Sequence, residues 1–485
     1  MEGRNILIII AIYFGLLLLV AWLTGGESSN NKAFFLGNKR SPWYIVSFGM
    51  IGTSLSGVTF VSVPGLVRQT DMTYMQVVLG FLFGYILIAR ILLPLYYKLN
   101  LTSIYSYLDR RIGPRGYRTG ACFFLLSKLI GAAARLYLVV WILQTYVFDR
   151  WHVPFIVTTV ASVFLVWLYT FRGGIRTIIW TDTLQAICLL AMLAGITWQL
   201  KNYLALDMTG IVQTLTASEH FRIFEWKDWS STQHFVKQFL SGVFIPVVMT
   251  GLDQDMMQKN LSCRNLREAQ RNMYSYGFAF IPINFIFLCL GILLLALAAQ
   301  QQIALPDGND DILPMFCTSG LLGYTTLVFF TVGIIAAAFS SADSALTALT
   351  TSFCVDILGL EKDTTQKAKR TRIRVHLLVA IVFTLVIISF RLFSSRSLID
   401  AIYMIASFTY GPLLGLFSFG LFTGRKPRNR QVPYVCIAAP VLCYALDWFL
   451  FQWTGYKSGY EILLLNGALT FAGLWFRSEK TETGQ

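Results

Sequence analysis

Apolar windows about 20 residues long recur from one end of this sequence to the other. An α-helix of roughly 20 residues can cross the ~30 Å hydrocarbon layer of a bilayer. The windows predict about thirteen such helices, over 5–24, 43–66, 73–98, 117–147, 152–171, 178–200, 233–257, 272–300, 316–358, 374–393, 399–424, 432–453 and 460–477. The expected fold is therefore an all-α membrane protein, with residues 1–485 forming one transmembrane domain.

Composition and charge support a bilayer as the solvent of this chain. The residues are 55% hydrophobic and 13% charged, so a soluble fold would have too little polar surface to cover its apolar side chains. With the N-terminus outside, about 26 Lys and Arg fall in cytoplasmic connections and about 9 outside, as the positive-inside rule requires. Lys259 is counted among these cytoplasmic residues. Basic loops also account for the net charge of +14, and we find no nucleic-acid-binding motif.

Small and hydroxylated residues interrupt the window 43–66. The stretch 49–59 reads GMIGTSLSGVT. Such a segment can unwind within the membrane and free backbone carbonyls that coordinate a hard cation. The alternative is that small residues only allow close helix packing.

Two aspartates lie in predicted spans, where an ionised group is expensive. Asp343 stands beside serines in the apolar run AAAFSSADS of residues 336–344, and it needs a cation, a proton or a basic partner. Asp182 lies near the start of the window 178–200, where it could bind a cation or merely cap the helix.

The window 117–147 carries two basic residues on one helical face. Lys128 and Arg135 are seven residues apart, with Gly131 and Ala132 between them. One interpretation pairs them with acids on neighbouring helices, such as Asp182 or Asp343. The other assigns them to an anionic substrate.

The sequence does not predict an enzyme. Its four histidines form no metal-ligand cluster, its eight cysteines show no CxxC spacing, and no nucleophile motif is present. We therefore expect no cofactor.

Several short motifs follow one another in a fixed order. They are Gly52-Thr-Ser-Leu55-Ser56, Trp180-Thr-Asp182-x-x-Gln185, Gly251-Leu-Asp253-Gln254-x-x-x-Gln258-Lys259, Ala337-x-x-Ser340-Ser341 and Gly411-Pro412-Leu-Leu-Gly415. In this order they resemble the sodium:solute symporter family, which includes bacterial sodium/galactose, sodium/proline and sodium/sialic acid transporters. Each motif alone is weak, whereas their joint order and spacing are specific.

The resemblance implies a fold, a location and a coupling ion. The fold is an inverted five-helix repeat of the LeuT type, with 43–200 as the first repeat and 233–424 as the second. The helix 5–24 and the helices within 432–477 are additions. The protein would lie in the bacterial inner membrane, and Na⁺ would be the coupling ion. The distribution of Lys and Arg predicts the N-terminus outside and the C-terminus in the cytoplasm.

The resemblance also implies a sodium site between the windows 43–66 and 316–358. By motif position its ligands are the carbonyls of Gly52, Leu55 and Ala337 and the hydroxyls of Ser340 and Ser341. Neutral oxygens suit Na⁺, a hard cation that must also be released.

Some family members have a second cation site. The matching positions here are Asp182, Ser340, Asp343 and Ser344, with an aspartate where a hydroxyl is expected. Three alternatives remain open at this site: a second Na⁺, a proton-coupled pair of acids, or an ion pair with a basic residue.

The function implied is sodium-coupled import of a small organic solute by alternating access. Ser56 and Thr59 match positions that line the substrate site, and another such position falls between Lys128 and Arg135. If these two cations face the solute, we expect an anion such as a carboxylate. The alternative is a membrane-embedded solute sensor built on a symporter-like bundle, which counterflow of labelled solute would exclude.

Overall fold

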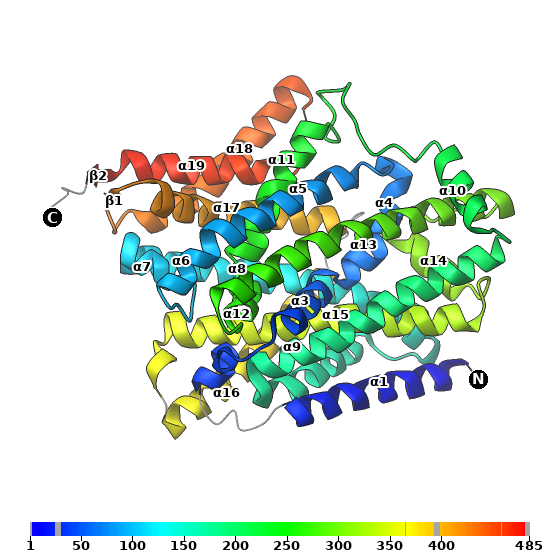
Figure 1. Ribbon diagram of the computed structural model, residues 1–485, viewed down its shortest axis with the longest axis horizontal. Helices are drawn as coiled ribbons and strands as arrows, with labels where there is room; N and C mark the ends of the chain where they lie inside the picture. The colour runs from blue at the N-terminus through cyan, green and yellow to red at the C-terminus, as the bar shows by residue number, and fades with distance from the viewer. Residues whose placement is uncertain (1, 25–30, 364, 392–397, 457, 481–485) are drawn as a thin grey trace.

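The computed structural model describes residues 2–24, 31–363, 365–391, 398–456 and 458–480, which are almost entirely helical (Figure 1). The α-helices are α1 (Glu2–Thr24), α2 (Asn31–Leu36), α3 (Trp43–Ser54), α4 (Gly57–Thr70), α5 (Tyr74–Leu87), α6 (Leu93–Lys98), α7 (Ser106–Arg111), α8 (Pro114–Leu143), α9 (Phe155–Tyr203), α10 (Met208–Ala217), α11 (Phe235–Pro246), α12 (Gln254–Leu261), α13 (Leu266–Gln301), α14 (Ile312–Thr318), α15 (Tyr324–Ser352), α16 (Gln366–Phe390), α17 (Leu398–Phe422), α18 (Val432–Thr454) and α19 (Ile462–Phe476). One-turn π-helical segments, η2 (Ile88–Leu92), η3 (Gln144–Phe148), η5 (Val247–Gly251) and η7 (Phe353–Ile357), extend α5, α8, α11 and α15.

The described residues contain eight helices long and apolar enough to cross a membrane, or up to ten if each of two bent helix pairs is one span. Three shorter apolar helices, Ile8–Thr24, Phe155–Phe171 and Ile462–Phe476, coincide with further predicted windows. The spans are helical because an α-helix hydrogen-bonds its backbone N–H and C=O groups to one another, and the bilayer core contains no water to do so. Length and composition thus establish eight to ten spans.

The helix α9 covers two predicted windows, 152–171 and 178–200, and breaks at Gly174. There φ is +61°, a left-handed conformation that favours glycine. A Cβ on Gly174 would also lie 2.7 Å from the Cα of Phe34 in α2. This close approach fixes the start of the second half of α9, which carries Asp182.

The centre of the bundle is formed by α3, the second half of α9 and α15. The helix α9 packs against both α15 and α3, and α12 contacts all three. Figure 1 shows α3 and α15 crossing in the middle of the molecule, with α1 along one edge and α18 and α19 along the other. Asp182, Asp343 and the serines that the sequence singled out beside Asp343 lie on these central helices, whereas Lys128 and Arg135 lie on α8.

The peripheral helices expose apolar side chains. On α18, Tyr434, Phe449 and Trp453 are largely exposed, and only 17% of its apolar window is buried. A helix that is apolar on its exposed side faces lipid.

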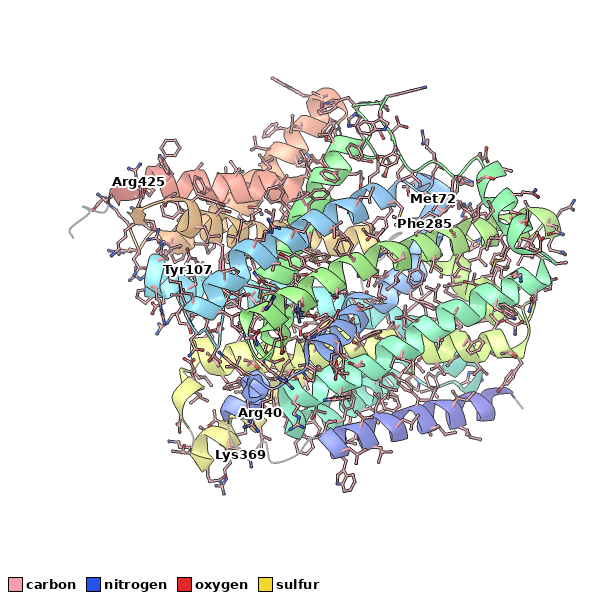
Figure 2. The ribbon with its side chains drawn as sticks, viewed as in Figure 1. Arg40, Met72, Tyr107, Phe285, Lys369 and Arg425 are labelled. Carbon is pink, nitrogen blue, oxygen red and sulfur yellow. The ribbon has the colours of Figure 1, made fainter. Side chains whose placement is uncertain are left out.

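Basic residues that the sequence assigned to cytoplasmic connections lie at one end of the bundle. Figure 2 shows Arg40, Lys369 and Arg425 at the same end of the bundle. The strand β1 (Arg425–Pro427) pairs antiparallel with β2 (Ser478–Lys480) at this end, while the start of α1 lies at the opposite end (Figure 1). This two-stranded pairing corrects the all-α prediction locally, because the chain there has left the apolar windows.

Candidate functional site

The first bent helix pair is α3 and α4, which meet at 60°. Leu55 leaves the helical region, with φ −76° and ψ 69°. Ser56 then begins α4 as its N-cap, accepting a hydrogen bond at 3.5 Å from the backbone N–H of Thr59. The break therefore falls inside the small-residue stretch that the sequence singled out, and the side chain at its cap is neutral.

The second bent pair joins the segment 235–251, formed by α11 and η5, to α12 at 68°. Here the cap is charged. The carboxylate of Asp253 accepts hydrogen bonds from the backbone N–H groups of Asp255 at 2.9 Å and Met256 at 3.4 Å. Both breaks leave backbone groups without helical partners, and such groups commonly bind substrates and ions in transporters.

The residues predicted to hold Na⁺ lie on facing segments of α3 and α15. Ser341 donates a hydrogen bond at 3.2 Å to the carbonyl of Thr53, which lies between Gly52 and Leu55. Ala337 lies one turn before Ser341 on the same buried helix. A Cβ on Gly52 would lie 2.6 Å from the backbone oxygen of Asp182, so glycine is needed for α3 to approach α9.

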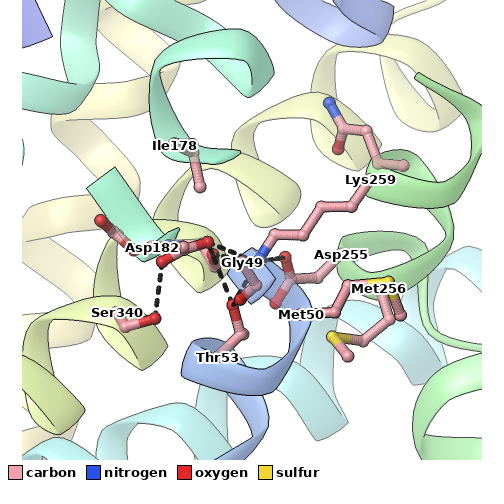
Figure 3. A network of polar contacts seen from close by, with 12 residues as sticks. Gly49, Met50, Thr53, Ile178, Asp182, Asp255, Met256, Lys259 and Ser340 are labelled. Atoms are coloured by element: carbon pink, nitrogen blue, oxygen red, sulfur yellow. Dashed lines mark hydrogen bonds and ion pairs between the residues drawn. The ribbon is translucent and has the colours of Figure 1, made fainter. Parts of the chain in front are cut away.

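Two of the four residues predicted for the second cation site, Asp182 and Ser344, contact the ammonium of a lysine. Figure 3 shows this lysine, Lys259, directed toward Asp182 and Thr53. The ammonium of Lys259 lies 2.7 Å from Oδ2 of Asp182 and 2.7 Å from Oγ of Ser344, and it also donates to the hydroxyl of Thr53. Ser340 donates to the other oxygen of Asp182 at 2.6 Å. Lys259 and Asp182 are both fully buried, with side chains 0% exposed. The counting of Lys259 as a cytoplasmic loop residue was therefore wrong.

Asp343 lies apart from this arrangement. Its carboxylate accepts a hydrogen bond at 2.9 Å from the hydroxyl of Tyr169 on α9 and another from the backbone N–H of Ser344. The structure thus brings Asp182, Ser340 and Ser344 together, while Asp343 is directed toward Tyr169.

A second buried lysine links α8 to α12. The ammonium of Lys128 lies 3.2 Å from Asp253 and 2.7 Å from Asp255, and Tyr410 of α17 donates to Asp253 at 2.7 Å. Asp255 is also 3.8 Å from Lys259. Lys128 thus pairs with acids of a neighbouring helix, as one interpretation expected. The acids named for it, Asp182 and Asp343, were wrong, because Asp182 pairs with Lys259 and Asp343 bonds Tyr169.

A central cavity adjoins both breaks. It contains about 1000 Å³ of empty volume, part of it open to solvent. All four residues predicted to contact substrate line it: Ser56, Thr59, Lys128 and Arg135. Arg135 is half-buried and forms no hydrogen bond or ion pair with any residue that the structure describes.

Polar and aromatic side chains complete the cavity wall. Tyr85 and Tyr276 both line it, and their hydroxyls are 3.0 Å apart. Tyr276 also forms a hydrogen bond of 2.6 Å with Ser54 at the end of α3. The cavity is therefore lined by hydroxyl groups, by the apolar faces of aromatic rings and by the guanidinium of Arg135.

A family model described as the sodium:solute symporter family matches residues 34–429. The chain belongs to this family. The match spans both helix breaks, the buried charged residues and the cavity, and it makes the chain a multi-pass membrane transporter. Bacterial relatives of this type place it in an inner membrane.

Two bacterial symporters match most of the chain. The sodium/sialic acid symporter NanT of Aliivibrio fischeri is 27% identical over 87% of this chain and 83% of its own length. The sodium/sialic acid symporter SiaT of Proteus mirabilis is 26% identical over 88% and 86%. The human sodium-coupled monocarboxylate transporter 1 is 25% identical over 52% of this chain and 40% of its own length.

Solved structures agree on the fold. A substrate-bound, outward-open structure of a Na⁺-coupled sialic acid symporter superposes with a TM-score of 0.83 at 21% identity, over 98% of this chain and 99% of that one. A closed structure of Mhp1, a nucleobase-cation-symport-1 family transporter, gives 0.59 at 15% identity over 93% and 94%. The helical bundle is thus a known transporter fold.

Sequence reasoning did not assign roles to Lys259, Asp253, Asp255 or Tyr410. A signal was present, since Asp255 and Lys259 are four residues apart and face the same side of a helix. The apolar window 233–257 nevertheless ended just before Lys259, so its burial could not be read from hydropathy.

Proposed function

We propose that this protein is a Na⁺-coupled symporter that imports a small organic anion, and that Arg135 holds the carboxylate of that solute. The single observation that carries the proposal is the position of Arg135 in the cavity wall, where its guanidinium forms no hydrogen bond or ion pair with any described residue. A guanidinium can bind a carboxylate through two parallel hydrogen bonds, and an unpaired one at membrane depth is costly.

Lys128 has a different role in this proposal. Its ammonium lies within 3.2 Å of two aspartates, so it is already paired. We therefore assign Lys128 to holding α8 against α12, and we assign direct contact with the anionic group to Arg135. Ser56 and Thr59 offer hydroxyls on the cavity wall for the uncharged parts of the solute.

A sugar acid is the substrate class that we test first. Two relatives that match most of the chain are named as sodium/sialic acid symporters. A sialic acid combines one carboxylate with several hydroxyls, which suits a wall of one guanidinium and several hydroxyl groups. N-acetylneuraminic acid is accordingly the first probe.

Sodium would bind on the opposite side of the first break from the solute. The proposed ligands are the carbonyls of Gly52, Leu55 and Ala337 and the hydroxyls of Ser340 and Ser341. Thr53 and Ser56 flank Leu55 and line the cavity, so both sites share one short segment. Binding at either site would then stabilise the same arrangement of α3 and α15 and raise affinity at the other.

The topology that accompanies this function has about thirteen crossings. The eight long helices, the two bent pairs and the three shorter apolar helices supply them. We infer that 43–200 and 233–424 are the two inverted repeats, since each begins with a bent pair. An odd number of crossings places the two termini on opposite sides of the membrane, and the excess of Lys and Arg in the predicted cytoplasmic connections assigns the N-terminus to the outside. Membrane-impermeant labelling of cysteines introduced at Glu2 and Ser478 would check this orientation.

The test of function uses the full chain in proteoliposomes. An inward Na⁺ gradient should drive uptake of labelled N-acetylneuraminic acid, and an equal K⁺ gradient should not. Arg135→Gln should abolish saturable uptake, and Arg135→Lys should reduce it because the planar fork is lost. Arg118→Gln, on the exposed face of α8, is the matched control and should transport normally.

A structural role for Arg135 predicts a different result. Arg135→Gln would then fail to give a monodisperse protein, whereas our proposal expects a folded protein that still gains thermal stability from Na⁺. If the wild type takes up no sugar acid or other organic anion in response to Na⁺, the proposed function is wrong.

A further inference from the structure

We propose that the ammonium of Lys259 is a built-in cation that fills the second cation site, so that the transporter couples one Na⁺, rather than two, to each solute molecule. The inference rests on the proposed function and deepens it, because it concerns the ion stoichiometry of the same site. It settles the three alternatives left by the sequence in favour of an ion pair with a basic residue.

The contacts of Lys259 are those of a bound cation. Three oxygens surround its ammonium, from the carboxylate of Asp182 and the hydroxyls of Ser344 and Thr53. The ammonium has three N–H donors, so these contacts use all of them. The three oxygens come from three different helices, α9, α15 and α3, and the lysine itself comes from a fourth, α12 (Figure 3).

A second Na⁺ would require the same oxygens. Asp182 is the only carboxylate in the predicted set that points into this site, because Asp343 is directed to Tyr169. Two cations on one buried carboxylate repel each other strongly, since the surroundings contain little water to screen them. While Lys259 is in place, Na⁺ is therefore excluded from the second site by both charge and space.

The tether distinguishes Lys259 from a bound ion. A sodium ion can leave the site during each cycle, whereas Lys259 stays attached to α12. Its ammonium also lies 3.8 Å from Asp255, which lies 2.7 Å from Lys128 in α8. The fixed cation thus ties α12 to α3, α9 and α15 without drawing on the transmembrane sodium gradient.

The number of Na⁺ ions per solute molecule sets the net charge that each transport cycle moves across the membrane. One Na⁺ moving with a singly charged anion transfers no net charge. Two Na⁺ would transfer one positive charge per solute, so the membrane potential would then drive uptake.

Sodium binding to the purified full chain tests the inference without any solute. Calorimetric titration with NaCl, at constant ionic strength with choline chloride, should give one Na⁺ per wild-type molecule. Lys259→Met removes the ammonium but keeps the apolar stem, so Asp182, Ser340 and Ser344 become available and the variant should bind two. Lys259→Arg keeps the positive charge and should bind one.

A double variant separates ion binding from folding. Lys259→Met combined with Asp182→Asn removes both charges of the pair and leaves Asp255 paired with Lys128, so this variant should fold and bind one Na⁺. Two Na⁺ bound to the wild type would refute the inference and leave the proposed function standing. One Na⁺ bound to Lys259→Met would also refute it.

The two proposals can fail separately. No Na⁺ bound to the wild type but one bound to Lys259→Met would support the built-in cation and contradict sodium coupling. In proteoliposomes, uptake by the wild type should not respond to a valinomycin-imposed potential, and uptake by Lys259→Met should increase when the inside is negative. A potential-driven wild type would count against the inference.

Discussion

The two helix breaks at the centre of the bundle are similar in shape and different in chemistry. The pair α3 and α4 bends by 60°, and the pair formed by 235–251 and α12 bends by 68°. The first is capped by the hydroxyl of Ser56 and the second by the carboxylate of Asp253. The two halves of the chain therefore contain helix breaks of similar geometry, one capped by a neutral side chain and the other by a charged side chain.

The difference shows how a transporter can bind a releasable cation at one helix break and keep permanently charged side chains at the other. Carbonyls and hydroxyls at the first break can hold a cation weakly enough to release it. At the second break Lys128 and Asp255 are within ion-pair distance, and each is nearly inaccessible to water. Buried pairs of this kind are costly to disrupt, because removing one partner leaves the other unpaired. The second break thus serves as a rigid counterpart to the first.

The largest effect is expected where the two breaks meet, at the ion pair of Asp182 with Lys259. Asp182→Asn leaves the Lys259 ammonium buried with a neutral amide in place of its carboxylate. Removing one partner of a buried ion pair costs about 3–5 kcal/mol. We expect a large loss of folded protein, measured by size-exclusion chromatography after heating. Restoration by adding Lys259→Met would identify the unpaired charge as the cause, and failure of this rescue would contradict the pairing.

A smaller effect is expected at the charged cap of the second break. Tyr410→Phe removes the hydroxyl that donates to Asp253 at 2.7 Å. A hydrogen bond to a charged group contributes about 1.5–3 kcal/mol, so thermal stability should fall while Na⁺ affinity remains close to that of the wild type. Tyr444→Phe, at an exposed position of α18, is the control and should change neither property. A loss of Na⁺ binding in Tyr410→Phe would contradict the assignment of ion binding to the first break and of a structural role to the second.

The smallest effect on stability is expected at the neutral first break. Ser341→Ala removes a proposed Na⁺ ligand and a hydrogen bond worth about 1 kcal/mol, and alanine favours the helix. Apparent Na⁺ affinity should fall roughly tenfold, which corresponds to about 1.4 kcal/mol, with little change in the sodium-free thermal stability. Thr347→Val is the control, since its buried hydroxyl has no partner among the described residues. Unchanged Na⁺ affinity in Ser341→Ala would show that the hydroxyl of Ser341 is not a Na⁺ ligand.

The sequence predicted the helices and the family for clear physical reasons. Spans follow from apolar length, because a bilayer excludes unsatisfied backbone groups, and each predicted window has a helix in the described structure. The motif order predicted the sodium:solute symporter family, which the family model confirms over 34–429. The sodium ligands and the role of Arg135 stay predictions until ion and solute binding are measured.

Local sequence patterns placed the first break and the two cationic positions of α8. Glycines and hydroxyl residues within 49–59 indicated a helix that can unwind, and the seven-residue spacing put Lys128 and Arg135 on one face. Both positions line the same cavity. Spacing along one helix could not reveal that Lys128 forms ion pairs and Arg135 forms none with the described residues, because the partners of Lys128 lie in and before another helix, α12.

Only the tertiary structure decided which charge meets which. Asp182 and Lys259 are 77 residues apart, and Lys128 and Asp253 are 125 apart. Hydropathy assigned Lys259 to the cytoplasm because a lysine raises the local cost of insertion, and that cost is offset when the fold supplies a carboxylate and hydroxyls from three other helices. The sequence by itself determined that buried cations and anions exist in this membrane protein. Their pairing depended on how α12 packs against α3, α9 and α15, since the energy of an ion pair depends on the distance between its charges and on the water around them.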